Sequence, residues 1–404
     1  MRTSRRIEGA SEEQGERLIR ILSAATFLIF FQAYMIAPLI PKLADVFHVS
    51  AQTIGVAVPA YMIPYGAATL FYGIVSDRVG RRPIILGSLA LFVALTTLTA
   101  LARSGGELVF WRLLTGIGAS GVVPIGLALM GDLFPYEKRG RPLGWLFGAM
   151  AGGMAFGSTF GVLLEPIVGW RSLFVGVGAL GLVCLILLAR QGKLLGSERR
   201  GVPATTAGVF KAYSKLLADW RGTRTYTYVL ANAIFHSGVY TWLGLYFARR
   251  YRLGEIGIGL ALLGYGVPGF ILGPVIGRAA DRWGRRWMIP AGLGIAALAA
   301  GALIFRLPIL AAALMVTVLS LGYDMTQPLL AGIVTTLDPE RGGQAMGLNV
   351  FALFTGFGLG SLIFGALLAP GFSRALLIFS VVQLLAALVA IPLYRSERRL
   401  PVGA

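Results

Sequence analysis

Long apolar runs alternate with short polar segments along the whole chain. About 20 helical residues cross the hydrocarbon core of a bilayer, because each residue adds about 1.5 Å. The runs are continuous rather than alternating, which indicates helices rather than strands in lipid. The expected fold class is an all-α polytopic membrane protein with twelve transmembrane helices, over residues 18–40, 52–74, 84–103, 108–131, 142–164, 171–190, 224–248, 257–277, 287–305, 308–334, 345–368 and 372–394.

A basic hexapeptide, Asp-Arg-x-Gly-Arg-Arg, occurs twice between apolar runs, at residues 77–82 and 281–286, 204 positions apart. The same offset maps Pro124 onto Pro328 and Tyr61 onto Tyr265. A chain that repeats itself at a fixed offset consists of similar structural units. The repeat predicts two pseudo-symmetric six-helix bundles, residues 1–190 and 224–404, joined by a central loop over 191–223.

The charge distribution predicts how the chain sits in the membrane. Charged residues make up only 13% of the chain, against about 25% in soluble domains. With both termini cytoplasmic, 27 of the 36 Lys and Arg residues fall on the inner side, 8 fall on the outer side, and Arg112 lies within a span. This is the positive-inside pattern of a multi-pass protein of the inner (plasma) membrane. The net charge of +18 is then explained by topology and contact with anionic lipid, so no nucleic-acid partner is expected.

The chain lacks the usual chemistry of an enzyme. Cys184 is the only cysteine, which excludes an intrachain disulfide and a cysteine-based metal cluster. No phosphate-binding loop and no nucleophile–base arrangement stands out. We therefore expect no catalytic site, no metal and no cofactor.

Three ionisable side chains lie inside predicted spans, where such groups are usually functional: Arg112, His236 and Asp324. Two spans also carry polar residues at helical spacing, which places each set on one helix face. These stripes are Asn232, His236 and Tyr240 in the seventh span and Ser320, Asp324 and Gln327 in the tenth. We expect both stripes to face a wet interior rather than lipid.

The repeat distinguishes polar residues that have a polar equivalent in the other half from charged residues that have no charged equivalent there. His236 falls on Gln32 of the first half, so these two polar residues are expected to face each other across the centre. Asp324 falls on Ser120 and Arg112 on Val316, so both charges break the symmetry.

The chemistry of these groups predicts their roles. A carboxyl in an apolar environment can titrate near neutral pH, so Asp324 is the candidate proton-coupling acid. His236 is expected to share this proton or bind substrate, or else to be a buried histidine bonded to a neighbouring helix. Arg112 is expected to attract an anionic group or stabilise a deprotonated acid, or else to clamp backbone carbonyls.

At the first hexapeptide, the sequence Gly73-x-x-x-Asp77-Arg78-x-Gly80-Arg81-Arg82 resembles the loop signature of the major facilitator superfamily. The second copy, with Asp281, Arg282, Gly284 and Arg285, is similar to the weaker copy of this motif in the second half of the family's members. The fourth span opens with Arg-x-x-x-Gly-x-Gly and ends in Asp132-Leu-Phe-Pro, which is also similar to the family's sequence at these places. The branch that the chain resembles is the drug:proton antiporter-like one. The Gly-Pro pair usual in helix 5 of that branch is absent.

The resemblance implies a central cavity lined by helices 1, 4, 7 and 10. It also implies that Asp77 lies at the N-terminus of helix 11 and that Arg81 pairs with Asp132, which would latch the two halves on the cytoplasmic side. Proton-coupled efflux of a small organic solute is the first interpretation. Uptake by a proton symporter or facilitator is the second, and a membrane receptor that transports nothing is the third. The expected partners are the solute, protons and membrane lipid, with the chain a monomer.

Overall fold

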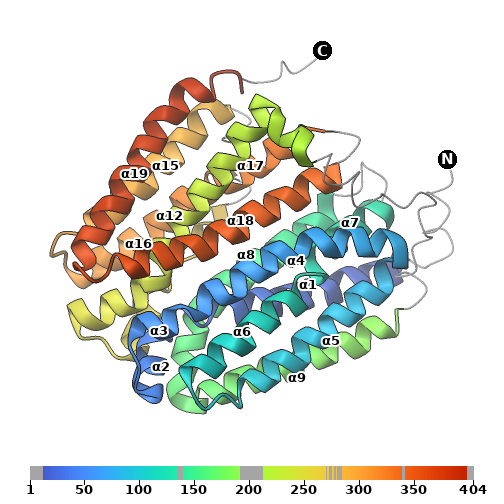
Figure 1. Ribbon diagram of the computed structural model, residues 1–404, viewed down its shortest axis with the longest axis horizontal. Helices are drawn as coiled ribbons and strands as arrows, with labels where there is room; N and C mark the ends of the chain where they lie inside the picture. Colours follow the sequence, from blue (N-terminus) through green and yellow to red (C-terminus); the bar gives the residue numbers. More distant parts are fainter. Residues whose placement is uncertain are drawn as a thin grey trace.

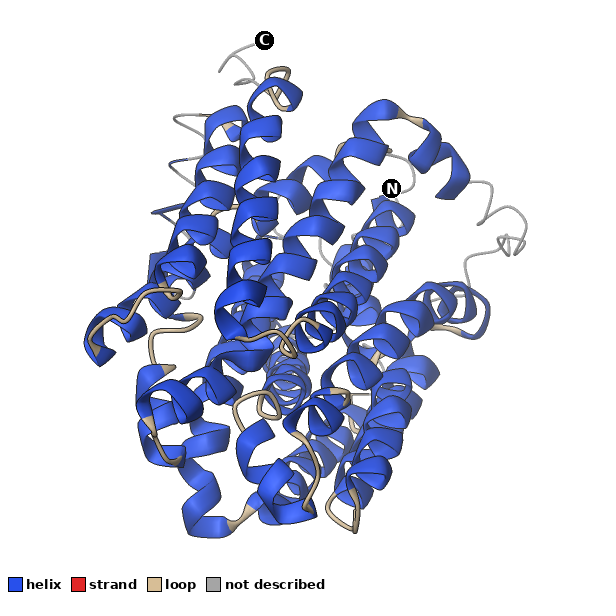
Figure 2. Ribbon diagram, turned by 60° about the vertical axis from the view of Figure 1, so that its left-hand side comes forward, coloured by secondary structure: helices blue, strands red, loops and turns tan. Residues whose placement is uncertain are grey.

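The computed structural model describes residues 12–133, 140–191, 213–269, 271–272, 275–276, 279, 284–338 and 342–397. Its regular elements in these ranges are helices that run roughly side by side in two groups (Figures 1 and 2). This is the expected all-α fold with two pseudo-symmetric bundles. The start of α1 (Glu12–Tyr34) and the end of α19 (Phe372–Leu393) lie toward one end of the molecule, which we call the terminal end, and the short helices α2 (Ile40–Phe47) and α3 (Ala51–Gly55) lie toward the opposite end (Figure 1).

The described part of the first half contains nine helices: α1 (Glu12–Tyr34), α2 (Ile40–Phe47), α3 (Ala51–Gly55), α4 (Ala57–Val79), α5 (Arg81–Thr99), α6 (Gly105–Ala119), α7 (Val122–Leu133), α8 (Gly140–Val168) and α9 (Trp170–Ala189). The described part of the second half contains α12 (Trp220–Tyr251), α13 (Glu255–Ala261), α15 (Arg285–Ala302), α16 (Ile309–Asp324), α17 (Gln327–Val334), α18 (Gly342–Ala366) and α19 (Phe372–Leu393). Of the described part of the central loop, residues 213–218 are helical, and residues 220–223 already belong to α12.

Within the described ranges, nine helical segments are long and apolar enough to cross a membrane. They correspond to nine of the twelve expected spans. The other three expected spans are 224–248, which lies inside α12, 257–277, which begins in α13, and 287–305, most of which is α15.

Two of the expected spans are not continuous helices, which corrects the prediction. Residues 108–131 divide into α6 and α7, and residues 308–334 divide into α16 and α17. The cause is proline, whose ring clashes with the carbonyl four residues earlier. For Pro124 that carbonyl belongs to Ser120, and for Pro328 it belongs to Asp324. The breaks therefore recur at equivalent places in the repeat.

The first span ends early as a helix, and the eighth is interrupted by turns before helix resumes at residue 267. α1 stops at Tyr34, and residues 35–39 form turns before α2. α13 stops at Ala261, and turns follow as far as Gly266, whose φ of 76° lies in the left-handed region. Glycine adopts this conformation without a steric penalty. Met62, the repeat equivalent of Gly266, continues the regular helix α4 instead.

The hexapeptide turns adopt the same backbone shape in both halves. Gly80 has a φ of 105° and Gly284 has a φ of 82°, and a new helix starts directly after each of them. Only glycine adopts such φ values readily, which explains the glycine at this place in each turn.

The two halves meet closely toward the α2/α3 end. α4 packs on α18, where the ring of Tyr65 stacks on that of Phe354 with centroids 4.1 Å apart. α13 packs on α8, where Gly259 lies against Leu163. Because α8 and α18 run toward this end and α4 and α13 start from it, these contacts hold the two bundles together on that side.

Candidate substrate and proton site

Asp324 is the last residue of α16, at the break in the tenth span. Its carboxylate Oδ2 accepts a hydrogen bond of 3.2 Å from the Ser320 hydroxyl, one helical turn earlier. On its other side the carboxyl lies against the backbone of Gly269, where a side chain at 269 would collide with it. Among the described residues no Lys, Arg or His lies within ion-pair distance of Asp324. The break thus leaves a half-buried carboxyl held by neutral groups.

Ser320 connects this carboxyl to the opposite half of the molecule. The Ser320 hydroxyl accepts a hydrogen bond of 2.9 Å from the Gly266 N–H. Gly266 in turn lies so close to α8 that an added Cβ would come within 2.6 Å of the Ala155 Cβ. A short path therefore leads from Asp324 through the turn at Gly266 to a contact between the two bundles.

His236 lies in a group of aromatic rings, which we call the aromatic cluster: Tyr34, His236, Tyr240, Tyr265, Tyr323 and Phe357, all buried. The ring of His236 stacks on Tyr323 with centroids 3.8 Å apart, and its Nε2 is hydrogen-bonded to the Tyr265 hydroxyl. Its Nδ1 has no partner among the described residues. The cluster spans both halves, because Tyr34 of α1 packs on Tyr240 of α12.

Arg112 clamps the end of α1. Its guanidinium is fully buried and donates to the backbone carbonyls of Gln32, Ala33 and Ala57 at 3.1–3.2 Å. It also donates to the Gln32 side-chain oxygen at 2.9 Å and lies 4.3 Å above the Tyr61 ring. The last carbonyls of a helix lack intrahelical partners and carry partial negative charge, which a cation stabilises. This geometry matches the last of the alternatives given for Arg112, a clamp on backbone carbonyls.

Gln32 and His236 each have a hydrogen-bonding partner in their own half. Gln32 binds Arg112 within the first half, whereas His236 binds Tyr265 within the second half. Their expected arrangement across the centre stays a prediction.

The two polar stripes reach several partners. The Asn232 amide donates to the Thr326 hydroxyl at 2.9 Å and accepts from Gln383 of α19 at 3.1 Å. Thr326 donates in turn to the carbonyl of Gly322, which the break in the tenth span leaves free. Gln327 is buried, and neither its amide nitrogen nor its oxygen has a partner among the described residues.

The contacts of Thr326 and Gln383, and the places of Tyr265 and Phe357 in the aromatic cluster, were missed from the sequence. Tyr265 and Phe357 lie on apolar runs with no polar spacing to mark them. Thr326 and Gln383 are single polar residues in otherwise apolar segments.

The hexapeptide loop is described in part. The Arg81 guanidinium is buried and donates to the Ser76 hydroxyl at 3.0 Å, and Ser76 donates to the Gly73 carbonyl. Arg285, its repeat equivalent, lies beside Gly332 of α17. The side chains of Asp77, Arg78 and Asp132, and the whole of Asp281 and Arg282, lie outside the described residues, so the expected latch stays a prediction.

The ion pairs of Lys42 at the α2/α3 end were also not predicted from the sequence. Lys42 Nζ lies 3.3 Å from Glu255 of the second half and 3.8 Å from Glu165 of its own half. The hydrogen bond to Glu255 raises the pKa of Lys42, and the charge of Glu165 adds to the effect. The pKa of Glu255 is lowered, first by its own backbone N–H and then by Lys42.

Comparison with known proteins agrees with this geometry. Several relatives match over most of the chain. The MFS-type transporter YceJ of Bacillus subtilis (strain 168) is 27% identical and the alignment covers 86% of this chain and 88% of that protein. The chloramphenicol resistance protein of Pseudomonas aeruginosa is 25% identical over 72% of this chain and 68% of that protein.

A solved structure has the same fold. It is a bacterial homologue of the human lysosomal transporter Spinster in an inward-facing, unoccupied conformation, with a TM-score of 0.77 and 17% identity over 97% of this chain and all of that chain. A family model described as Major Facilitator Superfamily matches residues 22–334 and 251–404. The chain therefore belongs to the major facilitator superfamily, whose members are membrane transporters rather than enzymes.

Proposed function

We propose that this chain exports a small organic solute in exchange for protons, with Asp324 carrying the coupling proton. The observation that supports the proposal is the position of Asp324: a half-buried carboxyl at a helix break, bonded to Ser320 and without a cationic partner among the described residues. A carboxyl without a paired cation can bind and release a proton without breaking an ion pair. The name of the chloramphenicol resistance protein among the relatives favours export over uptake.

Protonation would act through Ser320. While Asp324 is ionised, the Ser320 hydroxyl donates to it and accepts from the Gly266 N–H. A protonated carboxyl can itself donate to Ser320, and protonation makes this carboxyl a weaker acceptor for the Ser320 hydroxyl. The turn at Gly266 then loses part of its support, and with it the close contact to Ala155 of α8. The proton would thereby weaken the junction between the bundles on the α2/α3 side.

Orientation follows from the positive-inside pattern, which places the terminal end in the cytoplasm. The bundles hold together at the α2/α3 end, which is then the outer side. In this proposal the conformation described here is closed to the outside, and alternating access requires the α4–α18 and α8–α13 contacts to separate.

The aromatic cluster is the proposed solute site. Aromatic faces with a few polar atoms suit amphipathic organic molecules. The unpartnered Nδ1 of His236 is a polar atom available to a solute. A bound solute would replace ring contacts such as Tyr34–Tyr240, which join the halves.

Flux measurements in liposomes test this function. Purified protein is reconstituted with an imposed pH gradient, and uptake of a panel of organic solutes is followed. Export coupled to protons predicts movement against the solute gradient that reverses when the pH gradient is inverted. Asp324→Asn should abolish this pH-driven flux and retain solute exchange at equal pH, whereas Asp45→Asn, a matched change at an exposed acid, should keep both. Flux that only follows the solute gradient would show a facilitator, and flux in the same direction as protons a symporter.

A further inference from the structure

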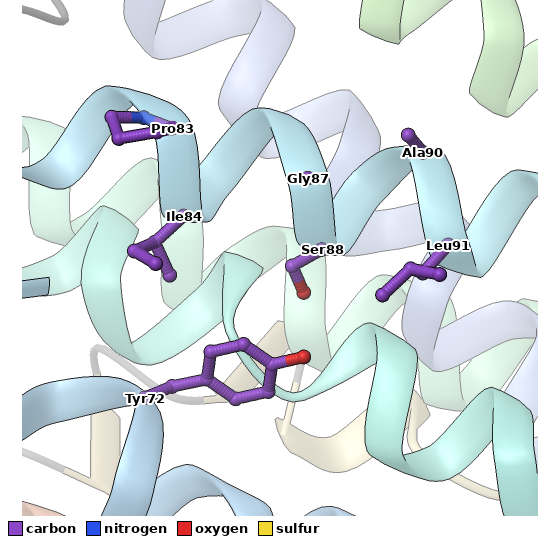
Figure 3. Close-up of a pocket in the computed structure, with 7 residues that line it drawn as sticks. All are labelled: Tyr72, Pro83, Ile84, Gly87, Ser88, Ala90 and Leu91. Atoms are coloured by element: carbon purple, nitrogen blue, oxygen red, sulfur yellow. The ribbon is translucent and has the colours of Figure 1, made fainter. Parts of the chain in front are cut away.

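A pocket of about 470 Å³ opens on the flank of the first half, between α4 and α5 (Figure 3). This volume falls within the roughly 300–1,000 Å³ of ligand pockets. Its lining is mostly apolar: Tyr72, Pro83, Ile84, Gly87, Ser88, Ala90 and Leu91. Ala90 and Leu91 are exposed on a spanning helix, so the pocket borders lipid rather than the aromatic cluster.

The pocket exists because position 87 has no side chain. A Cβ added at Gly87 would meet no atom within 4 Å, so the space beside it is empty. Pro83, Gly87 and Leu91 follow each other at intervals of four residues and therefore lie on one face of α5. Together they form a groove that runs along the helix, parallel to the lipid chains of a bilayer.

One wall of the pocket supports the break in the fourth span. The Ser88 hydroxyl donates to the Gly118 carbonyl and accepts from the Gly121 N–H at 3.0 Å. Tyr72 lies beside the same break, since a Cβ at Gly121 would come within 3.0 Å of its ring. Whatever fills the pocket therefore contacts the two side chains that pack on the junction of α6 and α7.

A cation lies at the start of α5, at the same end of this helix as Pro83, and its described contact is with the end of α9. Arg82 directly precedes Pro83 and is exposed, and its one hydrogen bond in the described structure is a long contact of 3.4 Å to the Ala189 carbonyl. Its remaining N–H groups can bind a phosphate. Arg82 lies in the first turn of α5, where the helix dipole also favours an anion.

We propose that this pocket is a phospholipid site of the leaflet at the terminal end. One acyl chain fills the groove beside Gly87, and the headgroup phosphate binds Arg82, with anionic phospholipid preferred. The charge complementarity between Arg82 and the phosphate selects a lipid as occupant rather than an uncharged solute. A bound chain packs on Tyr72 and Ser88 and stabilises the broken fourth span.

Photocrosslinking tests the site. The full chain is reconstituted with phosphatidylglycerol or phosphatidylcholine carrying a diazirine in one acyl chain, and labelled residues are mapped by mass spectrometry. The site predicts labels concentrated on Tyr72 and residues 83–91, several-fold above other lipid-facing helices. Gly87→Leu fills the groove and should remove most of this label. Gly176→Leu is the matched control, because position 176 is also exposed on a spanning helix with no atom within 4 Å of an added Cβ.

The headgroup is tested with Arg82→Gln. This variant should still be labelled in the groove but lose the preference for phosphatidylglycerol over phosphatidylcholine. Label spread evenly over the lipid-facing surface of the wild-type protein, or groove label unchanged by Gly87→Leu, would overturn the proposal. Displacement of the groove label by an uncharged transported solute would also overturn it, because the pocket would then be a solute site.

Discussion

Tyr61 and Tyr265 hold the same position in the two repeats but bind different polar groups. The Tyr61 ring lies under the guanidinium of Arg112, which is locked onto carbonyls of α1 and α4. The Tyr265 hydroxyl binds His236 instead, beside the carboxyl of Asp324. The first half therefore places a buried, carbonyl-bound arginine beside this tyrosine, whereas the second half places an imidazole and a carboxyl beside it.

This pair of tyrosines gives a matched test of the second half. The Tyr61 hydroxyl has no partner among the described residues, so Tyr61→Phe should leave thermal stability nearly unchanged. Tyr265→Phe leaves a buried imidazole nitrogen unpaired, which costs about 1–3 kcal/mol. Thermal unfolding of both variants in the same detergent checks the difference, and equal melting temperatures would contradict the His236–Tyr265 bond.

Arg112→Gln should damage folding before it affects coupling. The change removes donors from three buried carbonyls, and each unpaired acceptor costs about 1–3 kcal/mol. We expect low yield of folded protein and a lower melting temperature. Arg374→Gln, which alters an exposed arginine, is the control and should behave as wild type. A stable Arg112→Gln protein with no transport would instead indicate a direct role in transport.

Glu255→Gln should favour opening at the α2/α3 end. It removes the cross-half pair with Lys42, while Lys42 keeps Glu165 in its own half. Both partners are partly exposed, so the pair contributes about 1 kcal/mol or less, a population change of up to about fivefold. Spin labels at Ile167 and Leu310, both exposed at that end, report the distance between halves after Cys184 is replaced.

The same pair predicts a pH effect. Because the pKa of Glu255 is lowered, the pair is present above the ordinary carboxyl pKa of about 4.3 and is lost as pH falls through the lowered value. Acid should widen the wild-type distances and leave Glu255→Gln unaffected. An identical distance distribution for both proteins at neutral pH would show that the pair does not hold this end closed.

Glu397→Gln should lower stability in a pH-dependent way. Glu397 binds Arg221 through two hydrogen bonds and Arg224 at 2.6 Å. Burial raises the pKa of Glu397, but the hydrogen bonds from both arginines outweigh it, so the pKa is lowered overall. The ionised group therefore stabilises the fold above the ordinary glutamate pKa, and this contribution is lost as pH falls below it.

The expected loss for Glu397→Gln at neutral pH is about 1–3 kcal/mol. Melting temperatures of the two proteins should converge only as the pH falls through the lowered pKa of Glu397, below which the wild-type carboxyl is also neutral. Arg221→Gln, which keeps the Arg224 pair, should lose less. A difference that stays constant from neutral to acid pH would contradict the ionic origin of the effect.

The sequence predicts the fold well, because hydropathy and the repeat constrain it strongly. The broken spans were predictable too, since Pro124 and Pro328 block the helix at Ser120 and Asp324. The turn in the eighth span was harder to foresee. Pro64 lies inside a regular helix while its equivalent Pro268 follows a turn, and the difference lies in Gly266 replacing Met62.

The candidate site is harder to predict from the sequence, because its geometry depends on which helices approach each other closely. The contact of Asp324 with the eighth span depends on Gly269, which is one glycine among 55. The Arg112 clamp depends on α1 ending at Tyr34, which frees the carbonyls it binds. Spacing along a helix identifies a face, but it does not identify the neighbour that the face meets.

The most direct test of the account is proton release on solute binding. A transported solute is added to purified protein in weakly buffered detergent near neutral pH, and a pH indicator counts the protons released. Wild-type protein should release protons in proportion to the solute bound, whereas Asp324→Asn should bind solute and release none. Equal release from both proteins would show that the coupling proton resides elsewhere.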